Sequence, residues 1–163
     1  MPPVIAGVFV YILFSKNGIF GKLSWLYTQK VIIIAQILIV TPIICANIYP
    51  AVEEIRNSFV ETCLGLGISK FKMYRQLLKE STYSLSSALI TGFGRAISEV
   101  GAVMIVGGNI RYKTRVLTSA IVLENNKGNY SMSIKLGIIL MLISFGISIF
   151  AMIFSRRNDD KNI

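Results

Sequence analysis

Two long runs without a charged side chain constrain what this sequence can fold into. The first extends from Val31 to Val52, 22 residues, and the second from Leu136 to Ser155, 20 residues. As helices they would measure about 33 and 30 Å, because a helix rises about 1.5 Å per residue. The hydrocarbon core of a bilayer is about 30 Å thick, so runs of this length predict membrane-spanning helices. We therefore expect an all-α protein that crosses the membrane several times.

Two more segments complete the predicted helical bundle. Residues 2–15 are apolar but short for a full crossing, and residues 82–107 are interrupted only by Arg95 and Glu99. A hydrophobic content of 53% with 15% charged residues agrees, since soluble domains carry about 25% charged residues. The prediction is one transmembrane domain, 1–163, with spans at about 2–15, 31–50, 82–107 and 136–155. Within the second span we expect Pro42 to kink the helix and Pro50 to end it.

The sequence offers no combination of residues typical of catalysis. It has no histidine, no glycine-rich phosphate loop and no acidic cluster that could hold a metal. The two cysteines, Cys45 and Cys63, lie in or beside a predicted span without a CxxC spacing, and we interpret them as packing residues. We expect no catalytic residue, no metal and no bound cofactor in this chain.

The region between the second and third spans, residues 51–81, is the longest polar segment. Apolar residues at helical spacing (Val52, Ile55, Phe59 and Cys63) predict that it begins as an amphipathic helix. Gly65 and Gly67 interrupt that pattern, and a basic amphipathic stretch follows, with Phe71, Tyr74 and Leu78 on one side. The local prediction is a helix, a glycine turn and a second helix.

Arg95 and Glu99 are charged residues inside a predicted membrane span. Four residues apart on a helix, they share a face and can pair, which offsets part of the cost of each charge in the membrane. Two interpretations stay open. The pair either stabilises the helix end or a helix–helix contact, or it takes part in gating or in an anion pathway.

The same span carries a small residue at every fourth position: Ser84, Ala88, Gly92 and Ala96. Small side chains on one face allow another helix to approach the backbone closely. We therefore expect this helix to lie inside the bundle. After Asn109, a polar segment leads to Val116–Leu123, which is too short to span and is expected to form a surface or re-entrant helix.

The polar region resembles a known family. The run Glu61-Thr62-Cys63-Leu64-Gly65-Leu66-Gly67, followed by Phe71 and the basic helix, is similar to the EAA loop of ABC-importer permeases. Thr62 and Cys63 replace two alanines of that pattern, and Glu80 stands where proline is common. The resemblance implies that Glu61, Gly67, Phe71 and Arg75 couple the chain to a separate ABC ATP-binding subunit, which would use the ATP.

A second stretch resembles the tungstate-type permeases of that family. It extends from Gly92 to Ile110 and continues in Thr114–Thr118 and Ile121–Glu124. The resemblance implies a permease for tungstate import in the cell membrane. It further implies a homodimer, an extracytoplasmic oxyanion-binding protein and no nucleic-acid partner. It also implies that helices preceding the Pro2-Pro3 pair in such permeases are missing from this sequence.

Other functions stay open at this point. Molybdate or sulfate could replace tungstate as the substrate. Alternatively, the chain could be a non-transporting membrane anchor or assembly protein whose basic loop binds anionic lipid headgroups in the bilayer.

Charge helps little with orientation but suggests an anion-attracting surface. If the polar region is cytoplasmic, as the resemblance implies, eight Lys and Arg residues lie on each side of the membrane. The net charge of +9 is nevertheless concentrated in the two outer segments, 15–30 and 111–135. Arg111, Lys113 and Arg115 are therefore predicted to attract a divalent oxyanion, with an ordinary solvated loop surface as the alternative.

Overall fold

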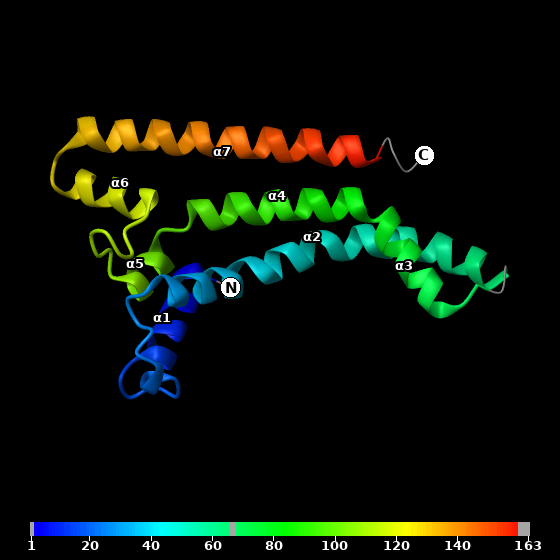
Figure 1. Cartoon of the computed structure of the whole chain (residues 1–163), viewed down its shortest axis with the longest axis horizontal. Coiled ribbons are helices and arrows are strands. Elements are labelled where there is room, and N and C mark those ends of the chain that lie inside the picture. The colour runs from blue at the N-terminus through cyan, green and yellow to red at the C-terminus, as the bar shows by residue number, and fades with distance from the viewer. Residues whose placement is uncertain (1, 66–67, 160–163) are drawn as a thin grey trace. The chain divides into compact units, whose positions relative to one another are not determined.

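The computed structural model describes residues 2–65 and 68–159, and within these ranges every regular element is a helix (Figure 1). In chain order the elements are α1 (Pro3–Phe14), the 3-10 helix η1 (Gly21–Leu23), α2 (Gln29–Gly65), α3 (Lys70–Glu80), α4 (Thr82–Ser98), α5 (Gly101–Gly107), α6 (Leu117–Asn126) and α7 (Tyr130–Asp159). The chain divides into two compact units. The first comprises Met1–Thr41 with Gly94–Gly146, and the second comprises Pro42–Phe93 with Ile147–Ile163.

Two helices are long and apolar enough to cross a bilayer. They are the segments Gln29–Glu54 of α2 and Tyr130–Ile153 of α7. The bent pair of α4 and α5 would make a third crossing if it is counted as one span, and α1 is a shorter apolar helix. In the 18-residue apolar window of α7 no residue is buried, and side chains such as Leu142 and Phe150 are exposed. Such an apolar, exposed helix is suited to lipid contact.

The prediction that Pro50 ends the second helix is wrong. Helix α2 contains both Pro42 and Pro50 and continues to Gly65. Each proline leaves the carbonyl four residues earlier without its helical donor, a loss that long membrane helices tolerate. The residues after Pro50 keep an apolar spacing of three to four, and no further helix breaker occurs before Gly65. The continuing amphipathic pattern therefore outweighs the local effect of one proline.

The core of the first unit lies among α1, α2 and α5. Its buried side chains are Val10, Phe14, Val31, Ile32, Ala35, Val103 and Val106. Aromatic rings close the end of this core, because Phe14 stacks on Trp25 and Phe20 with ring centroids 6.0 and 5.2 Å apart. The connection that follows α1 is thereby fixed against the helices that it joins.

In the second unit, α3 packs through one face. Met73 and Leu77 are buried one turn apart, whereas Phe71 and Tyr74 are exposed. Near the end of α2, the backbone N–H of Ile68 donates a hydrogen bond to the Cys63 carbonyl at 3.1 Å. This bond satisfies one of the last carbonyls of α2, which have no partner within the helix.

Candidate functional site

The predicted span 82–107 is broken at Glu99 and Val100. Helix α4 ends at Ser98, α5 begins at Gly101, and the two helix axes are bent by 60°. A break of this kind leaves carbonyls at the end of one helix and N–H groups at the start of the next without helical partners. In a membrane those groups need protein partners, because no water is available there to hydrogen-bond them.

Glu99 supplies one of those partners and is itself buried, with 7% of its surface exposed. Its Oε2 lies 3.2 Å from Nη2 of Arg95, so the structure brings the two predicted charged residues together as an ion pair. Its Oε1 accepts a hydrogen bond from the backbone N–H of Ala102 at 3.3 Å. One carboxylate therefore contacts both helices at the break.

Gln36 approaches the same break from α2. Its side-chain Nε2 donates a hydrogen bond to the Ala96 carbonyl at 3.4 Å, although the two residues are 60 positions apart in the sequence. Gln36 and Glu99 also line one cleft in the first unit, with a volume of 240 Å³. The other residues that line it are Ala96, Ile97, Val116, Leu117, Thr118, Leu140 and Ile143.

Helix α5 packs at very short range on its neighbours. A Cβ added to Gly7 of α1 would lie 2.7 Å from the Ala102 Cα, and one added to Gly107 would lie 2.8 Å from the Ile32 Cδ1. Real Cβ atoms do not approach backbone atoms this closely, so glycine is required at position 7 for the observed packing. The positions of α1 and α5 are thereby coupled, and the two helices lie side by side (Figure 1).

A polar network organises the loop that follows α5. Arg115 donates from Nε to Asn109 Oδ1 at 3.2 Å and from Nη2 to the Asn109 carbonyl at 3.3 Å. The buried Ser119 hydroxyl donates to the same Oδ1 at 3.0 Å. Asn109 adopts a φ of 49°, in the left-handed region that asparagine tolerates better than most residues. These bonds hold the backbone of the loop in its turn.

The three cations of the predicted anion-attracting surface therefore differ in their contacts. Arg111 and Lys113 are exposed, and the Arg111 guanidinium lies over the Tyr112 ring at 4.8 Å. Arg115 is half-buried and bound to Asn109. In this conformation Arg111 and Lys113 offer solvent-facing charge, while Arg115 mainly supports the loop.

Two of the four predicted coupling residues, Phe71 and Arg75, lie on α3. Phe71 is 80% exposed, and Arg75, one turn later, is exposed as well. Arg75 lines an open surface groove of 720 Å³ together with Lys72, Gln76 and Lys79. The backbone of Glu61 belongs to the last turns of α2, but its side chain and Gly67 lie outside the described residues.

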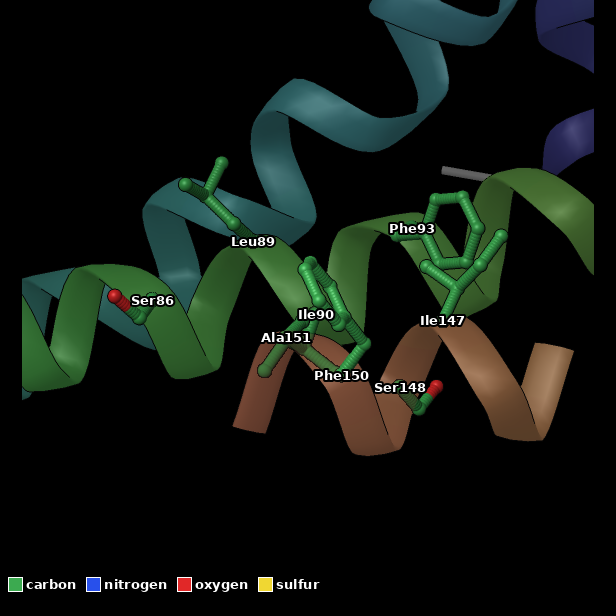
Figure 2. A pocket seen from close by; sticks show the side chains of 8 residues that line it. All are labelled: Ser86, Leu89, Ile90, Phe93, Ile147, Ser148, Phe150 and Ala151. Carbon is green, nitrogen blue, oxygen red and sulfur yellow. The ribbon is translucent and has the colours of Figure 1, made fainter. Parts of the chain in front are cut away.

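The predicted small-residue face of α4 is buried in its middle. Ala88 and Gly92 are buried, whereas Ser84 and Ala96 are half-buried. Another part of α4 lines an apolar groove of 360 Å³ with α7, shown in Figure 2. There Ile90 and Phe93 of α4 lie opposite Ile147 and Phe150 of α7, and the two polar lining residues are Ser86 and Ser148.

Gln36, Thr118 and the Asn109–Ser119 contact are absent from the sequence-based set of site residues. The available signal for Gln36 was an amide within the first charge-free run. Among the described residues, no group of three or more His, Cys, Asp or Glu side chains could hold a metal ion.

Comparison with known proteins identifies the type of chain that carries these features. Residues 1–160 match the family described as the inner membrane component of binding-protein-dependent transport systems. The chain belongs to this family. It is accordingly a multi-pass protein of the inner membrane and a permease component of an ABC-type transport system.

Three relatives show the range of similarity. The chain is 42% identical over 98% of its length to the tungstate uptake system permease protein of Peptoclostridium acidaminophilum, and it covers 69% of that protein. It is 35% identical over 88% of its length to the Campylobacter jejuni protein of the same name, covering 60% of it. It is 32% identical over 99% of its length to a probable anion ABC transporter permease protein of Haloferax volcanii, covering 72%. No solved structure matches the chain significantly.

Proposed function

We propose that this chain is the membrane-spanning part of an ATP-driven tungstate importer. The observation that carries the proposal is the 42% identity, over 98% of the chain, to a tungstate uptake permease. A permease named for sulfate transport and a putative molybdenum transport permease match over 96% and 89% of the chain, but at 26% and 25% identity. Tungstate is therefore preferred over sulfate and molybdate as the substrate.

The proposed partners follow from the transport mechanism. An external oxyanion-binding protein would deliver tungstate, and a second copy of the permease would complete the pathway. ATP would be bound and hydrolysed by a separate ATPase subunit, with no cofactor on this chain. The two exposed cations Arg111 and Lys113 would raise the local concentration of a divalent anion at the outer surface.

Coupling to the ATPase is assigned to the end of α2 and the segment that follows it up to α4, with Glu61, Gly67, Phe71 and Arg75 as the contact residues. The exposure of Phe71 and Arg75 on one face of α3 supports this assignment, because an aromatic ring beside an arginine is typical of energetically important interface residues. Movement of the ATPase subunits would then be transmitted through α3 to α4 and α2.

The substrate is tested by metal uptake in cells that lack the gene. At nanomolar tungstate, we expect deletion to abolish the accumulation of tungsten, measured by mass spectrometry of washed cells. Molybdenum content and sulfate uptake should stay at the parental level, and the full-length gene should restore tungsten. Unchanged tungsten with reduced molybdenum or sulfate uptake would assign the permease to that other oxyanion.

A further inference from the structure

The break between α4 and α5 depends on side chains for its hydrogen bonds. The Ala96 carbonyl accepts from Gln36 Nε2 and from the Glu99 N–H at 3.3 Å, and the Arg95 carbonyl accepts from the Ser98 hydroxyl at 3.0 Å. On the α5 side, the Ala102 N–H donates to Glu99 Oε1. Among these contacts, the bond between Glu99 and Ala102 joins a charged side chain to the backbone of α5.

The two bonds of the Glu99 carboxylate place different demands on the residue. The bond from Ala102 requires an acceptor oxygen at Oε1, which a glutamine would also provide. The ion pair with Arg95 requires the negative charge itself. The side chain of Glu99 is 8% exposed and that of Arg95 is 40% exposed, so the acid is the buried member of the pair.

We propose that Glu99 is a positioning residue that holds α5 at its 60° bend from α4 through the Ala102 N–H, with Arg95 acting as the counter-charge that keeps the buried carboxylate in place. The bend fixes one wall of the cleft lined by Gln36, Thr118 and Glu99. It also sets the close packing of Ala102 on Gly7 and of Gly107 on Ile32. A consequence for transport rests on the proposed function, whereas the consequence for α5 does not.

Four variants are expected to differ in how firmly they hold α5, in an unusual order. Glu99→Gln keeps the acceptor and removes the charge, so α5 should change little. Glu99→Ala removes the acceptor and should loosen α5. Arg95→Gln leaves a buried carboxylate without its counter-charge, which costs more than removing both charges. The double variant Arg95→Gln/Glu99→Gln should therefore be closer to the parent protein than Arg95→Gln alone.

The order can be measured by amide hydrogen exchange of residues 100–107 in the full-length protein reconstituted in lipid nanodiscs. Loss of one helix-terminal acceptor typically costs about 1 kcal/mol, which corresponds to about fivefold faster exchange. We expect at least this increase for Glu99→Ala and for Arg95→Gln, and less than about twofold for Glu99→Gln and the double variant. Glu124→Ala, which removes an acid remote from the break in sequence, is the matched control and should leave exchange in 100–107 unchanged.

Two results would overturn the proposal. One is parental exchange in Glu99→Ala, which would mean that packing alone holds α5. The other is a double variant no better than Arg95→Gln, which would mean that the buried charge is not what Arg95 balances. If Glu99→Ala does not fold, the comparison of Arg95→Gln with the double variant still decides the question.

Tungsten uptake by the same variants separates this inference from the proposed function. The expected order of uptake is parent and Glu99→Gln above the double variant, with Arg95→Gln lowest. The predicted exchange pattern in a protein that moves no tungsten would support the role of Glu99 and contradict the tungstate assignment. Tungsten uptake with parental exchange in every variant would contradict the role of Glu99 but not the tungstate assignment.

Discussion

At the scale of single residues, Gly7 is where the close approach of α1 and α5 is most sensitive. Gly7→Ala would place a methyl group 2.7 Å from the Ala102 Cα. Because backbone has to move to accept it, we expect a loss of about 1–3 kcal/mol, despite the better helix propensity of alanine. The loss would be measured as a lower midpoint of thermal unfolding in detergent.

Gly137→Ala is the matched control, since nothing lies within 4 Å of a Cβ added there. It should be neutral or slightly stabilising, because alanine is the better helix former. Equal midpoints for Gly7→Ala and Gly137→Ala would contradict the close packing of α1 on α5.

Glu124 organises the turn between α6 and α7. It accepts hydrogen bonds from Lys127 Nζ at 2.7 Å and from Asn129 Nδ2 at 3.1 Å. The hydrogen bond from the Lys127 ammonium is the main cause that lowers the pKa of the Glu124 carboxyl below its ordinary value. A lowered pKa in the folded state means that the ionised carboxylate stabilises the turn. This stabilisation is fully present above the ordinary pKa of glutamate, about 4.3. It is lost as the pH falls through the lower pKa of the folded state.

We therefore expect the turn to loosen as the pH falls from about 4 to the lower pKa of the folded state. Amide exchange of residues 124–130, corrected for its intrinsic pH dependence, would measure this. Glu124→Gln should remove this acid-dependent step while the neighbouring residues behave as before. A step of equal size in Glu124→Gln would show that another group causes it.

At the scale of the elements, the exposed face of α3 is where a partner is expected. Replacing Phe71 by Ala or Arg75 by Glu should reduce ATP-dependent transport by about tenfold, the effect usual for important interface residues, without loss of helix content. Lys22→Glu, which reverses an exposed charge on η1, is the control variant. Wild-type coupling in both α3 variants would place the ATPase contact elsewhere.

The sequence predicted which segments are helical and apolar but not where the helices bend. Charge-free runs correctly indicated α2 and α7, because hydrocarbon thickness alone demands such length. Pro50 did not predict the end of α2, since the pattern of apolar residues and the helix both continue past it. The break at Glu99 and Val100 contains no proline, and it is supported by a contact from Gln36, 60 positions away in the sequence, which local sequence does not encode.

The same limit applies to the candidate site. The spacing of Arg95 and Glu99 was enough to predict that they pair, because residues four apart share a helix face. It was not enough to show that Glu99 is the buried partner or that Arg115 is engaged by Asn109. The burial of Glu99 depends on the packing of other helices, and the Arg115–Asn109 contact depends on how the loop between them turns.

At the scale of the whole molecule, the outer surface should contribute to anion capture through long-range charge. Replacing Arg111 and Lys113 by Gln should slow tungstate uptake by up to about tenfold at low ionic strength, with little effect at high salt, because screening removes long-range attraction. Initial uptake rates at several salt concentrations would measure this dependence. Rates that fall equally at every salt concentration would contradict an electrostatic role.

Arg115→Gln provides the contrast within the same loop. It removes both hydrogen bonds to Asn109, so its defect should persist at high salt. A defect of Arg115→Gln that disappears at high salt would instead assign this arginine to anion attraction.

The chain is expected to work as the permease of an ATP-driven importer, and co-purification from the native membrane tests this role most directly. The full-length gene product would be tagged, extracted in mild detergent, and its complex weighed by native mass spectrometry. We expect two copies of the permease with two copies of an ATP-binding subunit, and ATP hydrolysis that rises when tungstate-loaded binding protein is added. A permease recovered without any ATP-binding subunit, under conditions that keep a known importer of the same cells intact, would contradict this role.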